Sequence, residues 1–222
     1  MSLKVVDMLK NLKILPIIKH FRCGYNYLCG SLNYYIDKKN VRAMATKEMP
    51  LVDIKDMAVY TGLSLIMKGM SVSPLKLQKI LYYEQSWHMV FFGRENTLFE
   101  DIPQAWVNGP VYPKIYHEYK GKVALMSDNL SASDFYSGNI EDRLKSLIAM
   151  FGWNKEQIEC IDSVITLYGA KTQDQLVMMT HIEDPWCEKR GDLLPFERSN
   201  EYMSLDSMHD YYKARYTRNR QQ

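Results

Sequence analysis

The segment at residues 73–93, SPLKLQKILYYEQSWHMVFFG, constrains the fold more than any other part of the chain. Ser73 is a favourable N-cap residue, and Pro74 suits the first helical position, where an amide hydrogen would have no helical acceptor. Apolar residues then recur at helical spacing until Gly93, a residue type that often ends helices. We therefore predict a helix over residues 74–92 whose buried face is formed by Leu77, Ile80, Leu81, Trp87 and Phe91.

Similar start and stop signals recur along most of the remaining chain. N-cap residues precede several apolar periodic segments, and two of these residues, Asn154 and Thr172, have a glutamine three residues later, as in a capping box. The predicted helices cover residues 54–68, 74–92, 113–120, 140–151, 155–168, 173–182 and 205–216. The polar stretches 122–139 and 187–203 are predicted to be loops.

Residues 105–119, AWVNGPVYPKIYHEY, combine a hairpin signal with two prolines. Asn108-Gly109 is typical of a tight hairpin turn, but Pro110 cannot donate a hydrogen bond to a returning strand. We expect a short edge strand that ends near Val107, followed by a Gly-Pro corner and a helix that begins at Pro113. The fold class predicted is mainly α: a single compact helical domain with a short β-hairpin or edge strand.

The composition is that of a globular chain with reduced thiols. Of the 222 residues, 46% are hydrophobic and 24% are charged, which is enough to form a substantial core. The four cysteines form no CxxC pair, and the longest apolar patch near the start is interrupted by lysines and too short to span a bilayer. We expect a cytoplasmic protein with no membrane span.

The first 43 residues differ from the rest of the chain. Residues 1–43 carry a net charge of +6, whereas residues 44–222 carry −4. Gly24 and Gly30 interrupt any long helix there, and Met44 begins a segment that has the pattern of a natural start. We interpret residues 1–43 as a basic extension, either a disordered tail or an over-long gene model, and residues 44–222 as the functional domain.

No catalytic, metal or cofactor motif is evident. The five histidines form no HExxH, and no G-x-S-x-G or glycine-rich phosphate loop is present. The candidate nucleophile–base arrangement is His181 with Cys187 or Glu183, but a reactive thiol needs an electropositive pocket, which the sequence does not identify. Lysine and arginine near the C-terminus favour a helix end, and the negative charge of residues 44–222 opposes DNA as a partner.

Three segments together resemble the SocA-like Panacea domain, the antitoxin component of many bacterial and phage-borne toxin–antitoxin pairs. The first lies at 73–89, the second in the proline-rich stretch and the third in THIEDPW at 180–186. Glu84 and Ser86 depart from the small residues usual in the family. The matching residues are Leu75, Leu77, Lys79, Tyr82, Gln85, Trp87, His88, Ala105, Trp106, Gly109, Pro110, Val111, Tyr116, Thr180, His181, Glu183, Pro185 and Trp186.

The resemblance implies a helical, non-catalytic antitoxin that neutralises a cognate protein toxin by direct binding, with the toxin gene expected nearby. Some relatives are described as adaptors that deliver the toxin to a protease, and the sequence does not choose between blockade and delivery. A DNA-binding autoregulator is the other alternative. We expect Trp87, Trp106 and Trp186 to be mainly buried, with partners for their indole N–H groups.

Overall fold

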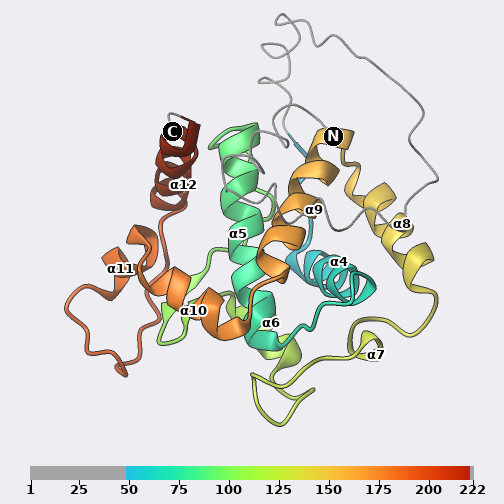
Figure 1. The fold of residues 1–222 in the computed structure, drawn as a ribbon, viewed down its shortest axis with the longest axis horizontal. Helices are drawn as coiled ribbons and strands as arrows, with labels where there is room; N and C mark the ends of the chain where they lie inside the picture. The colour runs from blue at the N-terminus through green and yellow to red at the C-terminus, as the bar shows by residue number, and fades with distance from the viewer. Residues whose placement is uncertain (1–48, 221–222) are drawn as a thin grey trace, which may run out of the picture.

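Helix α5 (Pro74–Phe92) is the central element of the fold, and the other helices are arranged around it (Figure 1). The structure is a computed structural model that describes residues 49–220. The Ser73 side chain accepts a hydrogen bond from the Lys76 amide, and Gly93 ends the helix, as predicted. The predicted single buried face was too narrow, because neighbouring elements bury α5 on nearly every side, polar residues included.

Several helices pack directly against α5. Two of them, α9 and α12, lie along its length on different sides (Figure 1), while α4 and α10 complete the surrounding layer. The short helix α6 contacts both α4 and α5, and α7 and α8 pack on α4 at the periphery. Their bounds are α4 (Ile54–Met67), α6 (Pro113–Tyr119), α7 (Ala132–Phe135), α8 (Ile140–Phe151), α9 (Lys155–Gly169), α10 (Gln173–His181) and α12 (Leu205–Arg220).

The predicted helix starts are confirmed by the cap geometry. Both capping boxes form at Asn154 and Thr172, and the Ser204 hydroxyl accepts from the Ser207 amide. Helix α9, however, continues through Gly169. A Cβ there would lie 2.5 Å from Cδ2 of Leu65, so the glycine permits close helix packing instead of ending the helix at that point.

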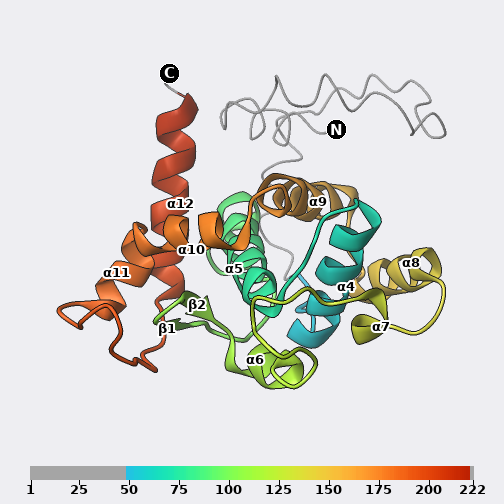
Figure 2. The same ribbon diagram turned by 60° about the horizontal axis from the view of Figure 1, so that its bottom comes forward.

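The proline-rich segment forms a true hairpin, so the predicted Gly-Pro corner is wrong. Strand β1 (Gln104–Trp106) pairs antiparallel with β2 (Gly109–Val111), and Ala105 lies opposite Pro110. The Ala105 amide donates to the Glu201 carbonyl, away from β2. Ala105 and Pro110 are therefore a pair that exchanges no hydrogen bond, and the missing amide hydrogen of Pro110 removes no bond between the strands. Figure 2 shows the hairpin between α11 and α6.

Two short helices occupy stretches that were predicted to be loops. Helix α7 lies within 122–139, and α11 (Asp184–Arg190) overlaps the start of 187–203. In α11, Pro185 lies in the first turn and the basic Lys189 and Arg190 in the last, which favours a helix that is too short to show apolar periodicity. Helix α12 also extends four residues beyond its predicted end.

The mainly α fold with a small antiparallel hairpin is therefore confirmed. Within residues 49–220, every helix is too short or too polar to cross a bilayer. The prediction for the basic extension, residues 1–43, lies outside the described residues.

Candidate functional site

Polar motif residues of α5 hold the segment that follows the helix. The Gln85 side chain accepts from the amides of Leu98 and Phe99, at 2.7 and 3.3 Å, and donates to the Phe99 carbonyl at 3.0 Å. One ring nitrogen of His88 contacts the Asn96 carbonyl at 2.9 Å, and burial lowers the pKa of His88 to about 4. These side chains supply hydrogen bonds to backbone that would otherwise be buried without partners.

Lys79 holds the hairpin in the same way. Its Nζ atom donates to the Pro110 carbonyl at 2.9 Å, and burial lowers the pKa of Lys79 to about 7. Gly109 has a φ of +92°, and a Cβ at this position would lie 2.5 Å from Oγ1 of Thr180 and 2.8 Å from Cε of Lys79. The glycine is therefore required both by the backbone conformation and by the approach of α5 and α10.

A stacked column joins α10, α11 and the hairpin. The His181 imidazole lies parallel to the Trp186 indole, with ring centroids 4.2 Å apart, and the Arg190 guanidinium lies 5.5 Å from the same indole. The Trp186 indole N–H donates to the Trp106 carbonyl at 3.0 Å. Burial, and then the charge of Lys79, lower the pKa of His181. Trp186 thus fixes α11 to α10 and to the hairpin.

Glu183 is a buried carboxylate at the junction of α5, α11 and α12. It accepts from the hydroxyls of Tyr212, at 2.5 Å, and Tyr83, at 3.4 Å, and its nearest Arg215 nitrogen is 3.6 Å away. Burial raises the pKa of Glu183 to about 7, although the Tyr212 hydrogen bond and the Arg215 charge favour the ionised form. This cluster connects three helices that are distant in sequence.

The two α5 departures from the family pattern are accommodated in the interior. Glu84 accepts from the Thr61 hydroxyl at 3.0 Å through each oxygen, and burial raises its pKa well above the usual value. The Ser86 hydroxyl donates to the Tyr82 carbonyl one turn earlier. Both polar groups therefore have partners, as burial demands.

The three motif tryptophans differ in burial. Trp87 is buried as expected, whereas Trp106 and Trp186 are half-buried. The indole N–H of Trp87 donates to the Tyr168 hydroxyl, and that of Trp106 donates to Gln104. The expectation that each indole has a partner is thus met, and Trp106 is left partly accessible.

A shallow pocket of about 450 Å³ lies beside the hairpin, next to several motif residues. Motif residues Leu75, Trp106, Val111 and Tyr116 line it, and Arg198 contributes a cation. Trp106 and Tyr116 pack edge to face, with ring centroids 4.9 Å apart. This pocket has the aromatic lining typical of protein contact sites.

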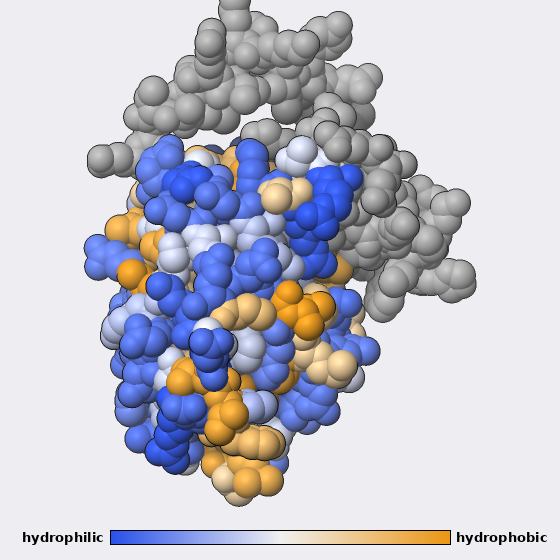
Figure 3. Space-filling model, turned by 90° about the vertical axis from the view of Figure 1, so that its left-hand side faces the viewer, coloured by the Kyte–Doolittle hydropathy of each residue, from blue (hydrophilic) through white to orange (hydrophobic). Residues whose placement is uncertain are grey.

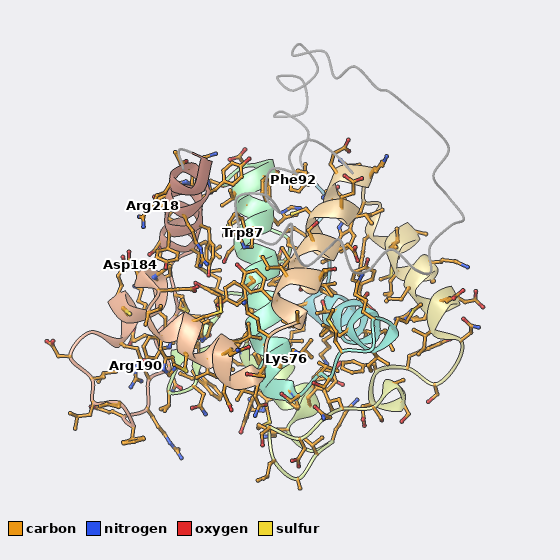
Figure 4. All side chains as sticks on the ribbon, viewed as in Figure 1. Lys76, Trp87, Phe92, Asp184, Arg190 and Arg218 are labelled. Carbon is orange, nitrogen blue, oxygen red and sulfur yellow. The ribbon has the colours of Figure 1, made fainter. Side chains whose placement is uncertain are left out.

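A second cleft, of about 550 Å³, separates α11 from α12. It is lined mainly by charged residues, including Asp184 and Glu188 on α11 and Arg215 and Arg218 on α12. Figure 4 labels Asp184 and Arg218 on these neighbouring helices. Because carboxylates and guanidiniums both line the cleft, it presents mixed charge rather than a single-sign field.

The geometry gives little support to catalysis at His181 and Cys187. The Cys187 thiol donates to the main-chain carbonyl of His181, while the imidazole stacks on Trp186. Burial, and then the charge of Asp184, raise the pKa of the thiol, which disfavours the reactive thiolate. In residues 49–220, no group of three or more histidine, cysteine, aspartate or glutamate residues is arranged to hold a metal ion.

The comparisons identify the family to which this arrangement belongs. A family model described as Antitoxin SocA-like, Panacea domain, matches residues 77–187, half of the chain. The chain belongs to the SocA-like Panacea family. Comparison with curated proteins and with solved structures found no match. The family supports an antitoxin role, implies a toxin as partner and suggests a non-catalytic protein.

The Panacea match includes the hairpin and the stack of His181 on Trp186 but ends before Arg190, Tyr212 and Arg215, which complete the site. The sequence patterns did not point to Gln78, Arg190 or Tyr212. Gln78 accepts from the Tyr112 amide at 2.8 Å and donates to its carbonyl, as Gln85 does further along α5. The seven-residue spacing of the two glutamines, about two helical turns, is the signal that could have revealed Gln78.

Proposed function

We propose that this protein is the antitoxin of a bacterial or phage-borne type II toxin–antitoxin pair and neutralises a protein toxin by binding it directly. Family membership supports the antitoxin role. Direct binding of the toxin is supported by the contacts of Lys79, Gln85 and Glu183, because each of these polar motif residues bonds to groups of its own chain. Those side chains stabilise the fold, and the surface around them is available for contact.

The distribution of charge and thiols supports a protein partner in the cytoplasm. Residues 44–222 carry a net charge of −4, which opposes broad contact with nucleic acid phosphates, so we do not propose DNA as a partner. Cys187 is a free thiol, which suits a reducing compartment. We further propose that residues 44–222 are sufficient for neutralisation and that residues 1–43 are dispensable.

Co-expression tests the proposal. The open reading frame adjacent to this gene is induced alone, with the full-length protein, and with a form that starts at Met44. We expect growth arrest in the first case and recovery in the other two, together with a stable complex of the two purified proteins. A harmless neighbouring product, or growth arrest that the full-length protein does not relieve, would contradict the antitoxin role.

The same cultures distinguish blockade from delivery to a protease. Under direct blockade, the amount of toxin stays constant while growth recovers, and the toxin purifies with the antitoxin. If the toxin instead disappears when the antitoxin is present and persists in a strain that lacks the responsible protease, then the protein acts as an adaptor and direct blockade is wrong.

A further inference from the structure

Residues 194–197, Leu-Pro-Phe-Glu, form a tight turn in the loop between α11 and α12. The Glu197 amide donates to the Leu194 carbonyl at 3.0 Å, the hydrogen bond typical of a β-turn. Pro195 occupies the second position, where its restricted φ favours this geometry. The turn lies beyond residues 77–187, the part of the chain that the family model matches.

A buried arginine fixes the turn to the body of the protein. The two terminal nitrogens of Arg190 donate to the carbonyls of Glu197, at 2.6 Å, and Leu194, at 2.8 Å. The Glu197 carboxylate also accepts from the Leu194 amide at 3.2 Å. Only 5% of Arg190 is exposed, and its guanidinium lies against the Trp186 indole. The conformation of the turn is therefore held by several groups at once.

The fixed turn directs its apolar side chains into solvent. Phe196 is 89% exposed and Leu194 is 70% exposed, so neither contributes much to the core. Figure 3 looks onto the side of the molecule that carries α11 and α12 and shows apolar groups set among hydrophilic surface. Because the backbone of the turn is already fixed, binding through Phe196 orders less of the chain, and exposed aromatic residues are typical anchors of protein interfaces.

The surroundings of the turn are acidic. Between residues 191 and 201, the exposed carboxylates Asp192, Glu197 and Glu201 outnumber the one cation, Arg198. None of these three carboxylates takes part in an ion pair that the structure shows within residues 49–220. Asp184 and Glu188 of α11 are not counted, because they line the mixed-charge cleft with arginines of α12.

We propose that the 194–197 turn is a preformed anchor that docks Phe196 and Leu194 into an apolar pocket rimmed by lysine or arginine on a protein partner. The acidic surroundings of the turn are the basis for the basic rim, through charge complementarity. This inference rests on the proposed function, in which that partner is the neutralised toxin, and it names the surface of the antitoxin that the toxin contacts.

Calorimetric titration with the product of the adjacent open reading frame measures the contribution of the turn. Phe196→Ala is expected to weaken binding at least about 30-fold, the loss typical of an interface hot spot. Pro195→Ala, which keeps Phe196 but loosens the turn, is expected to weaken binding about 2- to 5-fold. Leu125→Ala is the matched control, because Leu125 is 64% exposed but lies in the loop after α6, and its affinity should equal that of the wild type.

The outcomes separate this inference from the proposed function. If the wild type binds and Phe196→Ala binds within twofold of it, the anchor is wrong while the antitoxin role stands. If the wild type does not bind the product at all, both are wrong. Replacement of Phe196 by a photoreactive phenylalanine should crosslink to that product, whereas the same replacement at Leu125 should not; a crosslink between two copies of this chain would overturn the proposal in favour of self-association.

Charge substitutions test the basic rim independently. Glu201→Lys together with Asp192→Lys should weaken binding at least about 3-fold in low salt, and the difference from the wild type should shrink as salt is added. An affinity that rises on these substitutions would contradict a basic rim. Thermal unfolding of each variant controls for folding.

Discussion

The hairpin and the 194–197 turn are both held by a long polar side chain from a buried helix position, yet they direct their apolar residues in opposite directions. Lys79 bonds to the Pro110 carbonyl in the hairpin, and Arg190 bonds to the carbonyls of Leu194 and Glu197 in the turn. Val111 of the hairpin is 4% exposed, whereas Phe196 of the turn is 89% exposed.

The difference shows that the two loops are ordered for different reasons. Fixing the hairpin buries apolar area, so hydrogen bonds and the hydrophobic effect both favour the folded state there. Fixing the turn buries almost none of Phe196, so fold stability alone does not account for its position. The anchor proposed above accounts for it, and the following predictions probe this contrast from the largest expected effect to the smallest.

Replacing Gln85 with leucine should destabilise the segment that leads from α5 to the hairpin. Leucine leaves the amides of Leu98 and Phe99 and the Phe99 carbonyl without their partners. We expect the free energy of unfolding in urea to fall by about 4 kcal/mol, since each buried unsatisfied group costs about 1–3 kcal/mol. The control is Gln175→Leu, which removes an exposed capping-box partner and should cost about 1 kcal/mol or less. Equal losses for the two variants would contradict this role of Gln85.

Gly109→Ala should strain the hairpin without removing a polar group. The added Cβ meets Oγ1 of Thr180 at 2.5 Å, and the φ of +92° is unfavourable for alanine. We expect the free energy of unfolding to fall by about 3 kcal/mol. Gly121→Ala is the control, because a Cβ there meets no atom within 4 Å, and it should change stability by less than about 0.5 kcal/mol. A Gly109→Ala protein as stable as the control would refute the close approach of α10.

Lys79 should make the stability of the hairpin region depend on pH. The folded pKa of Lys79 is about 7, below its usual value of 10.5, so the unfolded state binds more protons between pH 7 and 10. The free energy of unfolding of the wild type should therefore rise with pH relative to Lys79→Met, by about 1 kcal/mol per pH unit. Urea unfolding of both proteins at pH 7, 8 and 9 measures the difference, and parallel pH profiles would show that Lys79 is not buried as a neutral amine.

Phe196→Ala should have the smallest effect on stability. Because the side chain is 89% exposed, its removal is expected to change the free energy of unfolding by less than about 0.5 kcal/mol. The matched substitution Phe99→Ala, at a fully buried position next to the hairpin, should cost about 3–5 kcal/mol. If Phe196→Ala were as damaging as Phe99→Ala, Phe196 would be part of the core and the contrast between the two loops would disappear.

Local signals in the sequence predicted the helices well but the hairpin poorly. Ser73, Asn154 and Thr172 cap helices where expected, because a cap depends on atoms three residues away. The hairpin was predicted as a corner because Pro110 lacks a donor. Whether that donor is needed depends on the register with β1, which orients the Ala105 amide toward Glu201, a residue almost a hundred positions later.

The candidate site was only partly predictable, because the roles of its residues also depend on partners that are distant in the sequence. The motif residues Lys79, Gln85 and Glu183 were identified by resemblance, but their partners include Pro110, Phe99 and Tyr212, which lie 14 to 31 residues away. Arg190 was missed because its importance comes from the carbonyls it reaches in the turn. The short helix α11 that presents it is too brief for a periodic apolar pattern.

The sequence by itself determined where the main helices begin, that the chain is mainly helical, and that it resembles the Panacea family, because caps, periodicity and motif order are local or linear properties. Only the tertiary structure decided that α5 is buried on nearly all sides, that Lys79 and Glu183 are internal, and that Phe196 is outside. Burial of a polar group is tolerable only when a partner from a distant segment satisfies it, and that partner becomes known only when the chain has packed.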